Sequence, residues 1–322
     1  MSTAHTLFPQ NLADYETLAI TRLVDNSVTD FDLFLDLEGT LVLYAGEGYK
    51  WLKEEMQALL SSGYDTFYIL KEDLKKAKMY LKLAELPKIE KNLPPYERIK
   101  SIEQVGSQFI KCLYEGEITS ACIEKSKVIA NSIADCIDED RTCIKAISGL
   151  ASHDYYTYYH SIRVATYSLA IAVEMGLSNA AQMKEIALGG IFHDIGKKAV
   201  GLDIINKTGS LTDEEWETMR SHPERGIASV ENSTLPHIPK EIILHHHEKL
   251  DGSGYPHGLG TNSLLPEVQI ATLADVFDAL TSSRTYQNKR SRFEALDFIK
   301  SKMIGPKLPY DAFSALVSCL KQ

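Results

Sequence analysis

Three consecutive histidines just before a glycine-rich turn constrain this chain more than any other feature. The segment His245-His246-His247-Glu248 is followed by Asp251-Gly252-Ser253-Gly254-Tyr255-Pro256. Burying several imidazoles and carboxylates together costs free energy unless they are paired or bind an ion. Nine of the ten histidines lie between His153 and His257, about a third of the chain, where an even scatter would place far fewer. The fold must therefore gather polar side chains around something, and a metal ion is the obvious candidate.

Length and charge narrow the class of protein. A chain of 322 residues is long for one domain and of ordinary length for two. A hydrophobic content of 44% is enough for a real core. The formal net charge is −10, and no long block of lysine and arginine appears, so binding to a nucleic acid polymer or an anionic membrane surface is disfavoured. A small anionic ligand is still compatible with this charge, because a bound metal inverts the local electrostatics.

Cysteine usage and hydropathy predict a cytoplasmic protein without a membrane span. The chain has no CxxC pair and an odd number of cysteines, which is typical of reduced, buried thiols. The first residues have neither the basic nor the apolar segment of a signal peptide, and no run approaches 18 apolar residues. The five cysteines are Cys112, Cys122, Cys136, Cys143 and Cys319.

The first 95 residues predict a small α+β module, which we interpret as a regulatory or partner-binding unit. Prolines at 87, 94 and 95 mark a linker at its end. Strands are expected over 31–45, with a turn at Gly39, and over 66–71, and helices over 49–62 and 72–84.

The turn sequence Asp36-Leu37-Glu38-Gly39-Thr40 resembles the first motif of haloacid-dehalogenase-type phosphatases, which use an aspartate nucleophile. Nothing after it supplies the later lysine and paired acids of that family. A polar hairpin turn is therefore the preferred interpretation, since Asp and Gly are common turn residues.

From about residue 97 onward the periodicity predicts helices almost throughout, so the protein as a whole should be mainly α. Thr212-x-x-Glu215 predicts a capping box at the start of one helix. We divide the chain into the N-terminal module (1–95), connecting helices (96–149) and a C-terminal domain (150–322). The irregular heptads of the connecting helices leave open whether they form a homodimer interface. The expected helices cover 98–113, 117–149, 154–175, 180–195, 212–221, 238–247, 265–282 and 291–302.

A histidine and an aspartate stand at the buried end of one of these helices. His193 and Asp194 follow the apolar run 187–192. A carboxylate in such a place must be paired or bound to a metal. Lys197 lies three residues further on and shares a helix face with Asp194. It is placed either to contact a phosphate oxygen beside a metal or to form a salt bridge with that carboxylate.

Further nitrogen and oxygen donors occur on other helices. His160 precedes an apolar helical segment, and His222 follows a charged one. Asp275 and Asp278 lie three residues apart on an apolar helix and share a face that must point at something polar. The donors include no thiolate, and this set favours iron or manganese, with zinc as a further candidate.

These residues resemble the HD superfamily of metal-dependent phosphohydrolases, and in particular its HD-GYP family, which hydrolyses the bacterial second messenger cyclic di-GMP. The resemblance covers about residues 150–315. It rests on a spaced series of motifs: His193-Asp194-Ile195-Gly196-Lys197, Asn206-Lys207-x-Gly209-x-Leu211-Thr212, Ser221-His222-Pro223-Glu224-x-Gly226, His246-His247-Glu248-x-x-Asp251-Gly252-Ser253-Gly254-Tyr255-Pro256, and Asp275-Val276-Phe277-Asp278-Ala279-Leu280-Thr281-Ser282-x-Arg284-x-Tyr286.

The resemblance implies a C-terminal all-α HD-type helical bundle and a metal-dependent cyclic di-GMP phosphodiesterase, controlled by the N-terminal module. It implies attack by a hydroxide bridging two divalent transition metal ions, with pGpG, GMP or both as products. Two alternatives are an HD hydrolase acting on cyclic GMP-AMP and a signalling adaptor that binds cyclic dinucleotides without turnover.

Carried over residue by residue, the resemblance also assigns roles. One metal would be held by His160, His193, Asp194 and Asp275, and the second by the bridging Asp194 with His222, His246 and His247. Catalysis is assigned to Asp194 and Lys197, and His245 to a structural or supporting place. Some members bind a third metal through a glutamate at the position of Tyr156, so two metals are expected here. The substrate-binding residues implied are Lys197, Arg284, Tyr255, Gly252, Gly254 and Asp278.

Overall fold

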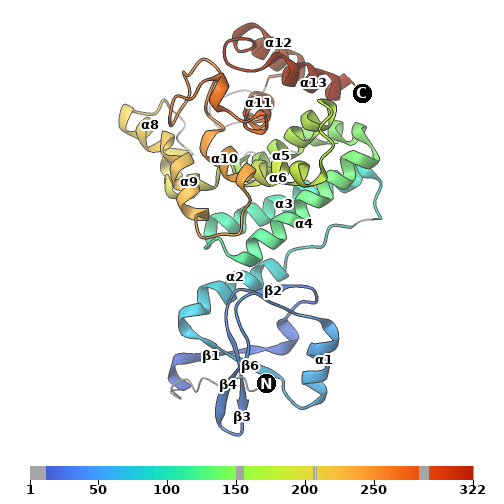
Figure 1. Ribbon diagram of the computed structural model, residues 1–322, viewed down its shortest axis with the longest axis vertical. Helices are drawn as coiled ribbons and strands as arrows, with labels where there is room; N and C mark the ends of the chain where they lie inside the picture. Colours follow the sequence, from blue (N-terminus) through green and yellow to red (C-terminus); the bar gives the residue numbers. More distant parts are fainter. Residues whose placement is uncertain are drawn as a thin grey trace. The chain divides into compact units, whose positions relative to one another are not determined.

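The computed structural model describes residues 12–90, 92–149, 156–205, 207, 209–282 and 290–321, without the side chains of residues 148, 149, 156, 157 and 202. The chain divides into two compact units, one of residues 1–86 with 115–125, the other of residues 87–114 with 126–322. In the described part, every named strand lies in the first unit, and the second is helical (Figure 1). The expected mainly α fold, with an N-terminal α+β unit, is confirmed.

The first unit is built on a four-stranded antiparallel sheet in the order β1-β6-β3-β4, with β2 and β5 forming a separate two-stranded ladder. Its core contains Trp51, Phe31 and Phe67, all fully buried. The elements are β1 (Tyr15–Ala19), β2 (Val28–Thr29), β3 (Leu33–Leu37), β4 (Thr40–Ala45), β5 (Tyr49–Lys50), α1 (Lys53–Ser61), β6 (Thr66–Leu70) and α2 (Leu74–Ala84), with short 3-10 turns η1 (Leu12–Asp14), η2 (Ile20–Arg22) and η3 (Lys71–Asp73).

The hairpin expected at Gly39 is present between β3 and β4. Glu38 and Gly39 have φ of 53° and 87°, as a two-residue loop matching the strand twist requires. The Asp36 carboxylate accepts a hydrogen bond from the Gly39 amide at 2.7 Å. Asp36 therefore serves a turn, and the hairpin interpretation of this motif is confirmed.

One expected helix starts later than the sequence pattern indicated. Tyr49 and Lys50 were expected in a helix over 49–62, but they form β5 and pair with Val28 and Thr29. The Trp51 indole then donates to the Thr29 hydroxyl at 3.2 Å. This tertiary pairing overrides the helical spacing of the apolar residues, so α1 begins only at Lys53.

The helical unit is arranged around α5 and α6. In it α5 packs against α6 and α11, and α6 packs against α10 (Figure 1). Helix α9 packs against η6. The helices are α3 (Pro95–Glu115) and α4 (Ser120–Glu139), each of which has some residues in the first unit, then η4 (Arg141–Gly149), α5 (Tyr156–Glu174), α6 (Ala180–Phe192), η6 (Ile195–Ala199), α7 (Leu202–Ile205), α8 (Asp213–Arg220), α9 (His222–Val230), α10 (His237–His245), η7 (Thr261–Ser263), α11 (Pro266–Thr281), α12 (Arg292–Lys302) and α13 (Tyr310–Lys321).

The helix expected over 117–149 is two elements. At Asp140 the side chain accepts a hydrogen bond from the Thr142 amide at 2.8 Å, which competes with continuation of the helix. Three helices, α7, α9 and α13, were not expected at all. The capping box of Thr212 and Glu215 is confirmed at the start of α8. None of the described helices combines the length and the apolar character that a membrane crossing needs.

Candidate metal centre

The seven residues expected to bind metal come from five segments of the helical unit and meet in its interior. Their donor atoms form two groups in which all members lie within 4.8 Å of one another. One group is Asp194, His222, His246 and His247, and the other is His160, His193 and Asp275.

Asp194 stands between the two groups. Its Oδ1 lies 3.4 Å from Nε2 of His222 and 3.7 Å from Nε2 of His246. Its Oδ2 lies 3.3 Å from Nε2 of His193 and 3.7 Å from Nε2 of His160. Each carboxylate oxygen therefore faces a different group, which is the geometry of a bridging ligand.

Backbone carbonyls fix the orientation of three of the imidazoles. In each case Nδ1 lies at hydrogen-bond distance from a carbonyl oxygen of the preceding helical turn, which leaves Nε2 directed at the centre. The pairs are His193 with Gly190 at 2.8 Å, His222 with Met219 at 2.8 Å, and His246 with Ile242 at 3.1 Å.

The centre has the electrostatics of a cation site. Burial, together with the charge of Lys197, lowers the pKa of His222 to about 3. Burial also holds the pKa of His246 and of His247 below the ordinary value, so these rings are neutral, as metal ligation requires. The Nε2 atoms of His222 and His246 face each other at 3.2 Å.

The carboxylate between the two groups stays ionised, although burial acts against it. The nearby His193 and Lys197 hold the pKa of Asp194 well below its usual range. Within the described part of the chain, Nε2 of His193 and Oδ1 of Asp194 are buried without a hydrogen-bond partner. A buried lone pair without a partner is costly. The donors thus fit divalent ions well.

His160 is held differently, by a carboxylate. Its Nδ1 lies 2.7 Å from Oδ2 of Asp278, while its Nε2 lies 3.1 Å from Oδ1 of Asp275. Asp278 also accepts a hydrogen bond from Nε of Arg163 at 2.6 Å and is only 1% exposed. Asp278 was expected to bind substrate, whereas in the structure both its oxygens are engaged inside the protein, with His160 and Arg163.

The network continues into α3. Arg163 donates to Oε1 of Glu103 at 3.2 Å. Burial raises the pKa of Glu103 to about 7, although the positive charge of Arg163 opposes the shift. At the other end of α3, the Tyr114 hydroxyl donates to the backbone carbonyl of Asp194 at 2.9 Å. Helix α3 therefore supports the centre at two points.

Lys197 occupies the position that its helical spacing indicated. Its Nζ lies 2.5 Å from Oδ2 of Asp194, and its side chain is 19% exposed. The structure thus shows the salt bridge between Lys197 and Asp194, with the ammonium at the edge of the centre. Arg284 and the side chain of Tyr156 lie outside the described residues.

The glycine-rich loop after α10 folds back over the candidate centre. The Tyr255 ring stacks on the His247 ring with centroids 4.6 Å apart. A Cβ at Gly254 would lie 2.4 Å from Cα of Glu248, so only glycine permits this approach. Gly252 has φ of +73°, which favours glycine. The structure gives both glycines a role in shaping the loop.

Three supporting residues were missed by sequence reasoning. Arg163 follows His160 by three residues on an apolar helix, and a buried arginine there was a signal that could have been used. Glu103 and Tyr114 carry no such signal, because only the tertiary fold brings α3 to the centre.

Comparison with known proteins gives this architecture a family. The model of the HD domain family matches residues 143–306, half of the chain. The chain belongs to the HD domain family. The expected membership of its HD-GYP branch is confirmed by this match together with relatives named cyclic di-GMP phosphodiesterases.

The HD domain is 37% identical over 148 residues to a protein of Pseudomonas aeruginosa named cyclic di-GMP phosphodiesterase PA4108, covering 46% of this chain and 36% of that protein. It is 38% identical over 160 residues to a cyclic di-GMP phosphodiesterase of Thermotoga maritima, covering 48% and 43%. It is 32% identical over 162 residues to 3'3'-cGAMP-specific phosphodiesterase 1 of Vibrio cholerae, covering 50% and 37%. This chain therefore spans less than half the length of these relatives.

The structure of Bd1817, an HDG"Y"P protein from Bdellovibrio bacteriovorus, is similar with a TM-score of 0.62, covering 96% of this chain and 100% of that one. At 20% sequence identity, this likeness supports the fold alone.

Proposed function

We propose that this protein is a metal-dependent phosphodiesterase that hydrolyses cyclic di-GMP to pGpG, GMP or both. The observation that carries the proposal is the position of Asp194, whose two oxygens face two separate groups of donors. Two ions sharing one carboxylate are typical of enzymes that cleave phosphoester bonds. Relatives named cyclic di-GMP phosphodiesterases support the substrate class.

The donor set determines which ions would fit. Imidazole nitrogens and carboxylate oxygens without a thiolate favour iron or manganese, and zinc is also accepted. His160, His193 and Asp275 would hold one ion and His222, His246 and His247 the other, with Asp194 shared. When bound, such ions polarise the phosphodiester and generate a nucleophile from water at neutral pH.

The remaining roles fall to residues of the chain itself. Lys197 carries three N–H donors, so it can keep its bond to Asp194 and direct another N–H to a phosphate oxygen. Its charge would then oppose the negative charge that develops on the phosphoryl oxygens. We assign Arg284 a second phosphate contact. Tyr255, stacked on His247, would form one wall against which the substrate lies.

A second candidate substrate is cyclic GMP-AMP, because a relative at 32% identity is named a 3'3'-cGAMP-specific phosphodiesterase. The centre described above recognises the phosphodiester that the two dinucleotides share. A non-catalytic adaptor is a weaker candidate, because a protein that only binds has no need of a complete ligand set. We also propose that the N-terminal unit regulates the enzyme or binds a partner, and that the protein forms a homodimer. Both parts of the proposal rest on the sequence.

Product analysis tests the proposal directly. The protein is purified without oxygen, supplied with iron or manganese, and incubated with cyclic di-GMP and, separately, with cyclic GMP-AMP. Chromatography should show a linear dinucleotide or a mononucleotide from one of them. Asp194→Ala should give none, while Asp297→Ala, at an exposed position of α12, should behave as the wild type. Binding measured by calorimetry without any linear product would overturn the enzyme and favour the adaptor.

A further inference from the structure

A third group of metal-type donors lies beside the centre but shares no residue with it. His245, Glu248 and His257 each offer one donor atom within 4.8 Å of the others. We propose that these three residues form an auxiliary site for one divalent transition metal ion, of the borderline type to which zinc and cobalt belong. The proposal concerns metal binding alone and does not depend on the proposed hydrolysis.

Burial makes this group more than a surface patch. His245 is 7% exposed and Glu248 1% exposed, whereas His257 is exposed. The rings of His245 and His257 have centroids 5.4 Å apart. The site thus has two ligands fixed in the interior and one at the surface, which gives an ion a path of entry.

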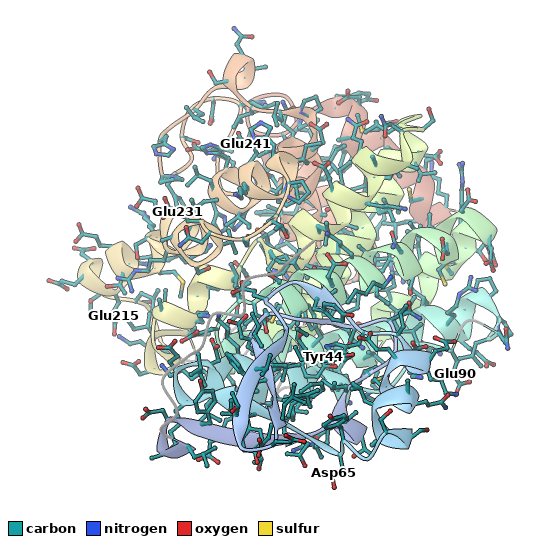
Figure 2. The ribbon with its side chains drawn as sticks, turned by 60° about the horizontal axis from the view of Figure 1, so that its bottom comes forward. Tyr44, Asp65, Glu90, Glu215, Glu231 and Glu241 are labelled. Atoms are coloured by element: carbon teal, nitrogen blue, oxygen red, sulfur yellow. The ribbon has the colours of Figure 1, made fainter. Side chains whose placement is uncertain are left out.

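An unpartnered nitrogen points to a ligand. Nδ1 of His245 is buried and has no hydrogen-bond partner among the described residues. Buried polar atoms are nearly always satisfied in native proteins. The other ring nitrogen, Nε2, lies 3.8 Å from Oε2 of Glu241, which is labelled on α10 in Figure 2. Glu241 therefore lies within ion-pair distance of this nitrogen, and a carboxylate there favours a ring that binds an ion through Nδ1.

The carboxylate of the group is held in place by the loop itself. Oε1 of Glu248 accepts a hydrogen bond from the His257 amide at 2.7 Å, and Oε2 accepts one from the Leu259 amide at 3.0 Å. Each carboxylate oxygen has a second lone pair, so these bonds fix the carboxylate without using up its capacity to bind an ion. Three protein ligands of this type, with a water as the fourth, are a common zinc arrangement.

The place of the site in the fold determines what an ion there would do. His245 ends α10 and is followed by two residues of the metal centre, while His257 follows the Tyr255-Pro256 segment of the loop. An ion held by both would tie the loop that carries Tyr255 to the end of α10. Occupancy should therefore make the loop around residues 251–263 more resistant to local opening.

Zinc stoichiometry tests this site on the full-length chain. The protein is stripped with a chelator, loaded with zinc, desalted and analysed for bound metal. With three donor groups in the described part of the chain, we expect three equivalents in the wild type and two in His257→Ala. The matched control is His237→Ala, an exposed histidine of the same helix outside the group, which should keep three. Zinc should also slow proteolysis within residues 251–263 in the wild type but not in His257→Ala.

Failure of the auxiliary site and failure of the proposed hydrolysis give different results. Equal zinc content in the wild type and His257→Ala, or an equal loss in His237→Ala, would overturn the auxiliary site. The Asp194→Ala background separates this result from the main centre, because the equivalent that depends on His257 should persist there. Absence of hydrolysis in the wild type supplied with iron or manganese, while the zinc-loaded wild type holds three equivalents, would contradict the proposed function and leave the auxiliary site standing.

Discussion

Replacing Asp278 with asparagine should weaken metal binding without touching a proposed ligand. In the wild type, the Asp278 carboxylate lies 2.7 Å from Nδ1 of His160 and accepts a hydrogen bond from Nε of Arg163 at 2.6 Å. Both partners are buried. An asparagine of the same shape has one carbonyl oxygen and no charge. Either the imidazole or the guanidinium must therefore lose its acceptor.

Two effects of Asp278→Asn can be estimated separately. Loss of a carboxylate behind a metal-bound histidine typically lowers metal affinity by about 10- to 100-fold. Breaking a buried ion pair costs about 3–5 kcal/mol. Arg163 keeps its ion pair with Glu103, at 3.2 Å, when Asp278 is replaced. We therefore expect the loss in the free energy of unfolding to lie near the lower end of that range, about 3 kcal/mol. For a unit of this size that corresponds to a fall in Tm of about 6–12 °C.

The assay measures both quantities on one sample. Metal affinity is obtained by competition with a chelator at a temperature where the variant is folded, and Tm by calorimetry of the metal-free protein. Asp297→Asn on α12 is the matched control, since that aspartate is exposed. If Asp278→Asn loses stability but binds metal within about twofold of the wild type, well inside the 10-fold floor for such partners, the link from Asp278 to the centre is refuted.

Three further outcomes follow from the same geometry. Asp194→Ala should abolish turnover and lower occupancy at both ions, measured by elemental analysis; full metal content with normal rates would contradict the bridging role. Lys197→Ala and Arg284→Ala should keep their metal while the rate of the chemical step falls by about two to three orders of magnitude; unchanged single-turnover rates would contradict a phosphate role. The pKa of Glu103 is raised to about 7, so its folded form retains a proton that the unfolded chain releases near pH 4.5, and the stability it contributes should fade between about pH 4.5 and 7. Glu103→Gln should therefore flatten the dependence of Tm on pH in that window, and the exposed control Glu97→Gln should not.

Local sequence was sufficient to select the donors that the structure brings together, because most of them carry a signal of their own, while their roles as metal ligands stay a prediction from the resemblance. A buried aspartate after an apolar run, as at Asp194, has to be compensated, and three adjacent histidines cannot all be incidental. At Asp278, which shares a helix face with Asp275, the same reasoning predicted a polar neighbour but not its identity. A shared face indicates that two side chains have neighbouring surroundings, but it does not say what those surroundings are. The structure supplies the missing partner, Arg163, from α5.

The differences in secondary structure have a related cause. Helix α9 begins at His222 with Pro223 in its first turn, a position where proline is well tolerated. The helix expected over 212–221 ends just before this proline, and no helix was expected after it. Tyr49 and Lys50 satisfied a helical pattern, yet pairing with Val28 and Thr29 gives them strand geometry. Long-range pairing of this kind cannot be inferred from spacing within one segment.

Helix α3 shows that the centre extends beyond the segment that defines the family. The family model begins at residue 143, but Glu103 and Tyr114 reach the centre through Arg163 and the Asp194 carbonyl. A chain lacking α3 would leave the buried guanidinium with one carboxylate fewer, and the carbonyl of the bridging aspartate without the phenol. Uncompensated buried polar groups are costly. The matched segment contains the seven proposed metal ligands, and α3 supports two of them, His160 through Arg163 and Asp278, and Asp194 through Tyr114.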